Sequence, residues 1–399
     1  MARKRFVVSD SKIEFPVQVM STNRDKGRTM PWMKASYAIR LKHKPLPTGY
    51  ANARATFKST PRRILFAVLV ASLVSFPMYS NRLFLQVAVI VGIMLPGAIA
   101  LTVLQGMSGL ISAGNAAFMA LGGLGVAMVL RINPGVPFVL NLLIGGVIAA
   151  IWGAIIGLAA LRVRGLYLLI ASLALQFIVV YIFQTYQTNT VGDSGFVFSA
   201  PKIGSIVITS LENWYYLVLV LTAFFIYIMK NWNQSRFGRS LIALRDGVDA
   251  AEILGVNVAR TTIVIFVLTS FMIGVQGVIY AYNVQCIQYT QFTFELAIKY
   301  VAIIIIGGQG SVLGVIFGTI FIVALPVILQ QISFHLPASM PGGHFFILHV
   351  ANIEKVIYGG LIIFFLLAAP GGLVEIWERT FKRIRMWPLS LTATDGVWE

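Results

Sequence analysis

Long apolar stretches separated by short polar loops run through this chain from residue 64 to residue 369. A membrane-spanning helix needs about 20 apolar residues, or somewhat fewer where flanking side chains reach the interface. Charged residues make up only 11% of the 399 positions, whereas soluble domains contain about 25%. The sequence therefore predicts an all-α, polytopic transmembrane helix bundle of about eight to ten spans. The candidate spans are residues 64–79, 83–104, 110–130, 136–161, 166–184, 213–229, 262–282, 294–306, 312–332 and 354–369.

Lysine and arginine residues gather at three places beside these spans, and the formal net charge is +17. The basic clusters lie in residues 1–63, 230–260 and 379–385. Basic loops stay on the cytoplasmic side of a membrane, so the three clusters should share one side. Ten spans satisfy this condition and nine do not, and we therefore expect both termini in the cytoplasm. The basic residues are not interleaved with aromatic ones as in a nucleic-acid-binding groove, and no nucleic acid is expected.

The chain divides by composition into three parts. Residues 1–63 are polar, basic and rich in proline, and they lack the apolar core of a signal peptide. We expect a disordered cytoplasmic tail that touches anionic lipid, although an added function or an over-extended start codon would fit the same residues. Residues 64–387 form the predicted transmembrane domain, and residues 388–399 form a short C-terminal tail.

Two glycine-dense stretches, residues 106–125 and 307–318, interrupt the apolar sequence. Small residues let helices pack closely, but they also occur in broken helices that expose backbone groups to a solute. One such stretch in each half of the chain favours discontinuous helices beside a translocation path. Ser108, Ser112 and Asn115 follow helical spacings of four and three, which would place three uncharged polar groups on one face. Hydrogen bonds that only stabilise the bundle are the alternative for these side chains.

The loop between the sixth and seventh spans contains a short polar segment with helix signals. Asp246 is a candidate N-cap, with Asp249 three residues later near the positive end of the helix dipole. Gly255 suits the left-handed position that closes a helix. Ala250 and Ala251 would keep one face of this two-turn helix flat. We interpret the segment as a docking helix for a soluble motor, and an ordinary surface helix is the alternative.

Ionisable residues are rare within the spans, and Glu295 with Lys299 could form an i, i+4 pair. A chain of buried Asp, Glu or His that could relay protons is missing from the sequence. A Walker-type phosphate loop is also missing, so ATP is not expected to bind here. We find neither a nucleophile with an oriented base nor metal-ligand spacing. The chain is therefore expected to be no enzyme, to need no metal or other cofactor, and to receive its energy from a partner.

Five segments together resemble the permease subunits of branched-chain amino-acid ABC importers, and specifically the M-type subunit. They occur in the family's order and span residues from about 85 to 387. The segments are GNAAFMALGG at 114–123, LRVRGLYLLIASLA at 161–174, SRFGRSLIALRDGVDAAEILGV at 235–256, GVIYAYNVQCIQYTQFTFELAIKYVAIIIIGGQGSVLGVIFG at 277–318, and APGGLVEIWER at 369–379.

The resemblance implies a multi-pass protein of the bacterial inner membrane. It implies a second permease subunit that completes the path, two cytoplasmic ABC ATPases that bind coupling helices, and a periplasmic solute-binding protein that delivers a small polar solute. The coupling helix would be residues 247–254, with its contacts made by Arg245, Asp246, Asp249, Ala250, Ala251, Glu252 and Gly255. The transport path would involve Ser108, Ser112, Gly114, Asn115, Phe118, Gly307, Gly308 and Gly310.

The chain departs from the family pattern at four positions. Related permeases usually have His at the position of Asn115 and an acidic residue at that of Lys299. Thr262 stands where a lysine is frequent, and Gln276 replaces a small residue. The first two departures concern the solute, so urea, short-chain amides or another small polar solute remain alternatives to branched-chain amino acids. A stand-alone facilitator is the alternative from another class.

Overall fold

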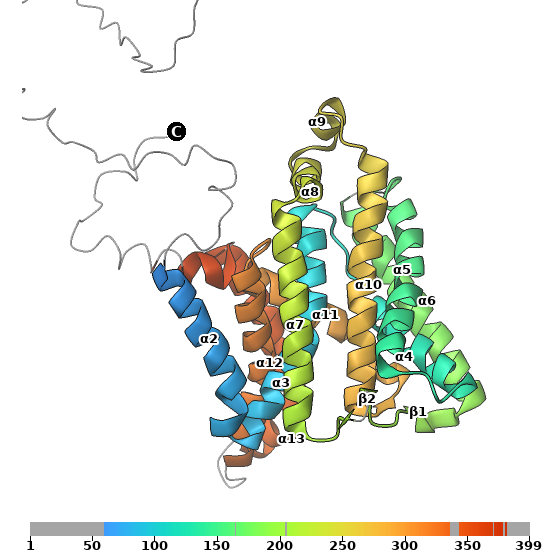
Figure 1. Ribbon diagram of the computed structural model, residues 1–399, viewed down its shortest axis with the longest axis vertical. Helices are drawn as coiled ribbons and strands as arrows, with labels where there is room; N and C mark the ends of the chain where they lie inside the picture. Colours follow the sequence, from blue (N-terminus) through green and yellow to red (C-terminus); the bar gives the residue numbers. More distant parts are fainter. Residues whose placement is uncertain are drawn as a thin grey trace, which may run out of the picture. The chain divides into compact units, whose positions relative to one another are not determined.

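The computed structural model describes residues 60–163, 165–203, 206–335, 343–369, 371–377 and 380 (Figure 1). The tail predicted for residues 1–63, apart from its last four residues, and the C-terminal tail lie outside the described residues. The long helices are α2 (Thr60–Tyr79), α3 (Arg82–Leu101), α4 (Asn115–Ile132), α5 (Phe138–Ala159), α6 (Leu166–Thr190), α7 (Leu211–Gln234), α10 (Val258–Val284), α11 (Phe294–Gly307), α12 (Val312–His335) and α13 (Gly343–Ala368).

Eight apolar helical segments in the described part of the chain are long enough to cross a membrane. They comprise α3 with its π-helical extension η2 (Thr102–Met107), α4, α5, α6, α7, α10, α11 with the preceding turn, and α12. This confirms the predicted all-α, polytopic bundle, and α2 and α13 occupy the two remaining predicted spans. α13 begins well before the predicted start of its span at residue 354, because the polar residues of its first turns had suggested a loop.

The two ends of the bundle differ in structure. At one end α8 (Arg236–Asp246) and α9 (Val248–Ile253) form a hairpin that projects beyond the other helices (Figure 1). At the other end β1 (Phe196–Val197) pairs antiparallel with β4 (Cys286–Ile287), so that Phe196 lies opposite Ile287. β2 (Lys202–Ile203) pairs with β3 (Ile206–Val207), and η3 (Gly192–Ser194) and η4 (Tyr289–Gln291) are single turns. We call these ends the hairpin end and the strand end.

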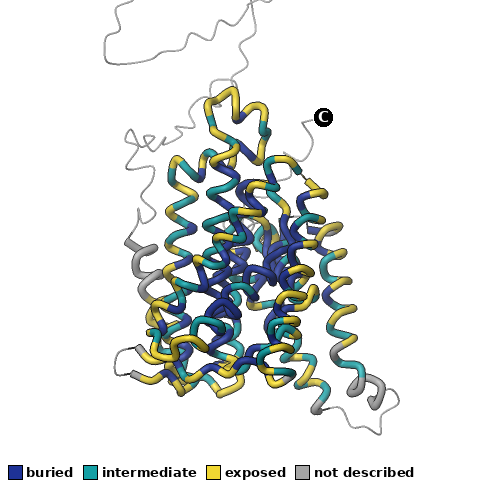
Figure 2. The backbone as a smooth tube through the Cα atoms, turned by 90° about the vertical axis from the view of Figure 1, so that its right-hand side faces the viewer, coloured by how far each residue is buried: buried dark blue, intermediate teal, exposed yellow. Residues whose placement is uncertain are grey.

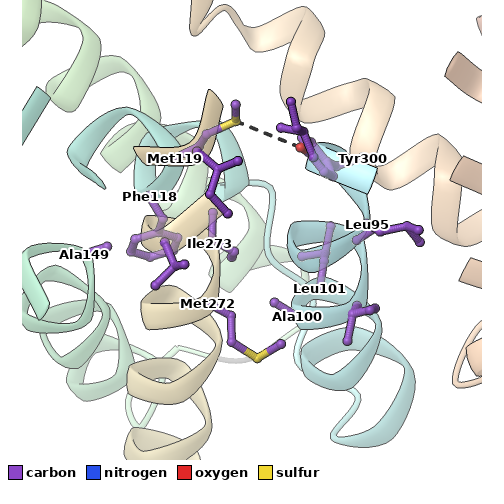
Figure 3. Packing of buried hydrophobic residues seen from close by; sticks show 14 of the residues in the cluster. Leu95, Ala100, Leu101, Phe118, Met119, Ala149, Met272, Ile273 and Tyr300 are labelled. Carbon is purple, nitrogen blue, oxygen red and sulfur yellow. Dashed lines mark hydrogen bonds between the residues drawn. The ribbon is translucent and has the colours of Figure 1, made fainter. Parts of the chain in front are cut away.

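The core surrounds α10, whose most apolar window is 72% buried, whereas the corresponding windows of α5, α6 and α7 are about one-third buried or less. Figure 2 shows this concentration of buried residues in the middle of the bundle. α5 approaches α10 closely because small residues line the contact, and a Cβ atom added at Gly153 would overlap the side chain of Ser270. In Figure 3, Phe118 of α4 lies beside Ile273 of α10, and the Tyr300 hydroxyl of α11 lies 3.9 Å from the Met119 sulfur.

Three described helices contain a proline, and each proline leaves the carbonyl four residues earlier without its usual N–H donor. In each case a hydroxyl group from a neighbouring helix donates to that carbonyl instead. The pairs are Tyr215 to Leu73 at 2.8 Å beside Pro77, Thr222 to Gly92 at 2.9 Å beside Pro96, and Tyr358 to Ile322 at 3.0 Å beside Pro326. These bonds fasten α7 to α2 and α3, and α13 to α12.

The predicted span 110–130 is not one continuous helix. After η2 the residues from 108 to 114 have no regular structure, and helix resumes at Asn115. Ser108, Ser112 and Asn115 therefore do not share one helical face, and that prediction is wrong. The physical cause is that Gly109 takes the left-handed region at φ +71°, while the backbone N–H of Ala113 bonds to a side chain of α6. A second break separates α11 from α12, so the predicted discontinuous, glycine-rich helices are confirmed.

Candidate functional site

The hairpin begins with a well-defined helix start. Ser235 is the N-cap of α8, since its hydroxyl oxygen accepts from the Gly238 N–H at 3.0 Å. Leu241 and Leu244 are buried and hold α8 to the bundle. Helix α8 continues through Asp246, so the prediction that Asp246 caps the docking helix is wrong.

The helix predicted to dock a partner corresponds to α9, and its N-cap is Gly247, which makes no side-chain cap bond. α9 ends as predicted. Gly255 has φ +82°, and its N–H bonds to the Glu252 carbonyl at 2.9 Å. The next N–H, from Val256, bonds to the Ala251 carbonyl at 2.9 Å. These two bonds form the Schellman motif, in which a left-handed glycine satisfies the last helical carbonyls.

The tip of the hairpin presents apolar and acidic side chains to its surroundings. Ile253 is 87% exposed and Leu254 is 77% exposed, and Asp249 and Glu252 are exposed beside them. Ala251 is only 1% exposed. Ala250 is exposed while Ala251 is buried, so the two alanines do not form one flat face. The Ile253–Leu254 pair was not predicted, although two large apolar residues next to a helix-closing glycine could have indicated a contact surface.

Arg245 connects the hairpin to the first helix break. Its guanidinium Nη1 donates to the Gly106 carbonyl at 2.6 Å, and its aliphatic stem packs at Gly109. A charged donor makes this a strong bond. Arg245 was predicted to contact an ATPase, and in this structure its guanidinium binds a carbonyl of the same chain.

The two helix breaks meet through glycine backbones. A Cβ atom added at Gly106 would overlap the backbone of Gly310, and one added at Gly308 would lie 2.5 Å from the Gly371 carbonyl. Gly308, Gly310 and Gly372 all have positive φ, which glycine adopts without strain. We call these five residues the glycine junction. Gly307 also packs tightly, against the Gly314 carbonyl. The predicted path residues Gly307, Gly308 and Gly310 therefore lie in close backbone contacts.

The other predicted path residues lie in and after the first break, and most are internally satisfied. The Ser108 hydroxyl donates to the Leu104 carbonyl at 2.5 Å, and the Ser112 hydroxyl accepts from the Gly114 N–H at 3.3 Å. Phe118 is 2% exposed. Asn115 differs, since it is 1% exposed and its amide nitrogen and oxygen have no hydrogen-bond partner among the described residues.

Four ionisable side chains of α11 and α13 form a second polar feature, which we call the charge cluster. Lys299 Nζ lies 2.9 Å from Glu354 Oε1 and 3.4 Å from Glu295 Oε1, and Lys355 Nζ lies 3.1 Å from Glu295 Oε2. The predicted Glu295–Lys299 pair is thus confirmed. The shorter contact to Glu354 was missed, because it joins helices that are distant in sequence. Lys299 also lies 5.4 Å from the ring centroid of Tyr358.

A cavity of about 490 Å³ lies beside the charge cluster, between α3, α11, α12 and α13. Lys299 and Tyr358 are on its wall, and Gln86 and Gln330 add amide groups. Most of its remaining lining is aliphatic. The arrangement combines one ion-paired lysine, neutral polar groups and an apolar wall, which can bind a small solute that has both polar and apolar parts.

Comparison with known proteins gives a consistent result. The family described as "Branched-chain amino acid transport system / permease component" matches residues 83–366. The high-affinity branched-chain amino acid transport system permease protein LivM of Escherichia coli K12 is 25% identical over 350 residues, covering 81% of this chain and 78% of that protein. A probable LivM of Methanocaldococcus jannaschii is 24% identical, covering 59% and 68%.

More distant relatives include a galactose/methyl galactoside import permease, MglC of Haemophilus influenzae, which is 29% identical over 36% of this chain and 45% of its own length. No solved structure matches the chain significantly. The family match runs from the start of α3 to near the end of α13 and covers both helix breaks and the hairpin. This protein therefore belongs to the family of permease components of branched-chain amino acid transport systems.

Proposed function

We propose that the chain is a non-catalytic permease subunit of an ATP-driven importer for branched-chain or related small amino acids. It forms the translocation path with a second permease subunit, and a periplasmic solute-binding protein delivers the solute. Two cytoplasmic ABC ATPases supply the energy. The observation that carries this proposal is the α8–α9 hairpin, whose tip is exposed while Arg245 bonds its base to the first helix break.

In this proposal α9 is the coupling helix. Ile253 and Leu254 fill an apolar groove on an ATPase, because burying two large aliphatic side chains supplies about 3–6 kcal/mol before the costs of association. Asp249 and Glu252 flank the pair and face basic groups on the rim of that groove. Arg245 transmits the movement of the hairpin to Gly106, and the shift of the glycine junction opens one end of the bundle.

The hairpin end faces the bacterial cytoplasm in this proposal, and the strand end faces the periplasm. Arg236, Arg239 and Arg260 support the orientation, since basic residues stay on the cytoplasmic side of spans. The chain lies in the inner membrane, and the exposed aliphatic side chains of α5 and α6 suit contact with lipid or with the second permease. The two termini are then cytoplasmic.

Two other functions remain to be separated by experiment. Urea, amides or sugars are alternative solutes, and the partial similarity to a sugar permease favours testing sugars. A stand-alone facilitator is the other alternative. Uptake of radiolabelled solutes into proteoliposomes separates them. The proposal expects amino-acid uptake only with both permeases, the ATPases, the binding protein and ATP. Uptake by this chain alone would identify a facilitator.

The coupling role of α9 has its own test. Ile253→Ser with Leu254→Ser should reduce retention of the ATPases on the purified permease at least tenfold, which corresponds to about 1.4 kcal/mol. Ile132→Ser is the matched control, because Ile132 is 86% exposed at the end of α4 near the strand end. Undiminished retention by the double variant would contradict the assignment.

A further inference from the structure

The charge cluster places two ionisable side chains on α11, which is apolar and long enough to cross a membrane with its preceding turn, and two on α13, which occupies a predicted span. Ionisable groups at membrane depth are rare because each is costly, and they usually mark a solute path or a site of subunit contact. Lys299 is 24% exposed and Glu354 is 13% exposed, so both are partly withdrawn from solvent. Lys299 nevertheless lies on the wall of the cavity described above. Lys299 therefore faces a space that a small molecule can enter, and Glu354 lies 2.9 Å from its ammonium nitrogen, next to the wall.

The charges of the cluster sum to zero. Two lysines face two glutamates, and every member has an oppositely charged neighbour within 4 Å. A ligand with a net charge would leave one charge uncompensated in a poorly hydrated place, which is strongly unfavourable. A ligand that carries one positive and one negative group keeps the sum at zero. It can replace the single Lys299–Glu354 contact with two contacts of the same kind.

The rest of the cavity limits the shape of such a ligand. Val87 and Ile90 of α3 and Val323 and Val327 of α12 contribute an aliphatic wall. The volume lies within the usual range for ligand pockets, roughly 300–1,000 Å³. A compact ligand with a branched aliphatic part would fill this wall, whereas a sugar would leave its hydroxyl groups facing methyl groups.

We propose that this cavity is a solute-binding site for a zwitterionic, aliphatic amino acid. Lys299 binds the carboxylate, Glu354 accepts from the ammonium group, and the aliphatic wall contacts the side chain. Glu295 then remains to balance Lys355. This inference rests on the proposed function and goes beyond it, because it locates the recognition at the charge cluster and not at the helix breaks.

The test uses site-specific labelling in the assembled transporter. Cys286 is the one cysteine of the chain, so Cys286→Ser gives a background without thiols in this subunit, and Gln330→Cys places one thiol at the cavity. A fluorescent maleimide labels it in proteoliposomes that contain the second permease, the ATPases and the binding protein. Leucine should slow the labelling. Isovalerate and isoamylamine, which each keep one of the two charged groups, should protect much less at equal concentration.

Variants of the cluster then assign the effect. Lys299→Met and Glu354→Gln should each raise the leucine concentration needed for protection about tenfold or more, because each removes one charge-assisted bond. The exchange Lys299→Glu with Glu354→Lys restores an ion pair and should recover part of the protection, which separates binding from folding. Lys202→Met is the matched control, because Lys202 belongs neither to the charge cluster nor to the lining of the cavity. Lys202 is exposed in β2, and its substitution should leave protection within twofold.

The outcomes separate the two proposals. A Gln330→Cys transporter that imports no amino acid under any condition, while the Cys286→Ser background also imports none, refutes the proposed function. Normal leucine import without leucine protection refutes only the binding site. Equal protection in the Lys299→Met variant refutes it as well. If adding the second permease alone abolishes labelling, the cavity wall is a subunit contact, and the binding site is again refuted.

Discussion

Thr222→Val should lower the free energy of unfolding by about 1–2 kcal/mol, although valine has the same shape as threonine. Pro96 cannot donate to the Gly92 carbonyl, and the Thr222 hydroxyl supplies the missing bond at 2.9 Å. Thr222 is 6% exposed, and Val218 fills the space beside Gly92, so water cannot take over the bond. The carbonyl would therefore be buried without a partner in the variant.

The magnitude follows from two limits. An unsatisfied buried acceptor costs about 1–3 kcal/mol in soluble proteins. Hydrogen bonds between membrane helices average about 0.6 kcal/mol and reach about 1.7 kcal/mol, because unfolded states in a membrane also find partners. The Thr222 bond should lie near the upper membrane value, since its acceptor has lost its only helical donor.

A double-mutant cycle tests this explanation. Pro96→Ala restores an N–H group that can bond to the Gly92 carbonyl, so Thr222→Val should then cost less than about 0.5 kcal/mol. The four proteins would be compared by steric trapping in bicelles or by SDS-induced unfolding. Equal costs of Thr222→Val in the Pro96 and Pro96→Ala backgrounds would show that the bond does not compensate for the proline, and the reasoning would fail.

Three further substitutions probe the hairpin and the glycine junction. Gly255→Val should weaken ATPase retention by up to about tenfold, because a β-branched residue at φ +82° is strained by about 1–2 kcal/mol. The strain comes from the backbone alone, since no atom lies within 4 Å of the added group. Gly255→Asn should retain the ATPases nearly as well as the unchanged protein does. Arg245→Met should leave ATPase retention unchanged but raise the number of ATP molecules hydrolysed per imported solute, because the bond to Gly106 is lost. An unchanged number of ATP molecules per solute would exclude Arg245 as the connection between the hairpin and the glycine junction. Gly106→Ala should lower the stability of the folded protein by about 1–3 kcal/mol, because the added methyl group overlaps the backbone of Gly310. The loss of monodisperse protein on heating measures this effect. Gly359→Ala is the control and should be neutral, because the added methyl group meets no atom within 4 Å.

Apolar stretch length was sufficient to predict the helices, but local signals could not determine where the first break lies. Residues 108 to 114 are as apolar and as rich in small residues as a tightly packed helix. The chain leaves helical geometry at Gly109, whose φ is +71°, and a tertiary contact then holds the non-helical segment, since the N–H of Ala113 bonds to the Ser172 hydroxyl of α6 at 2.9 Å. The N-cap was misplaced for a related reason. Ser235 and Asp246 both suit a cap, and only the buried Leu241 and Leu244 show that one helix runs between them.

The candidate site was predictable where it depends on backbone geometry and hidden where it depends on side chains from distant helices. Gly255 could be assigned from residue type, because a left-handed helix end favours glycine. The Lys299–Glu354 contact could not be assigned, since 55 positions separate the two residues and no periodicity relates them. Gln276 was predicted to stand where related permeases have a small residue, and in the structure it is buried, donates to the Tyr300 hydroxyl, and packs against Gly97. A substitution that looks disruptive in sequence is thus accommodated by its neighbours.

One short helix joins the two parts of the proposed mechanism. α11 carries Lys299 near its start and ends at Gly307, immediately before Gly308 of the glycine junction, so about 12 Å of helix separates the charge from the break. Gly310 in that junction contacts Gly106, and Gly106 accepts the bond from Arg245 at the base of the hairpin. A movement of α9 therefore has a continuous route of packed backbone to the cavity. If the route operates, Arg245→Met should change leucine protection at Gln330→Cys when ATP is added but not in its absence, and equal changes under both conditions would show that the residue acts only on folding.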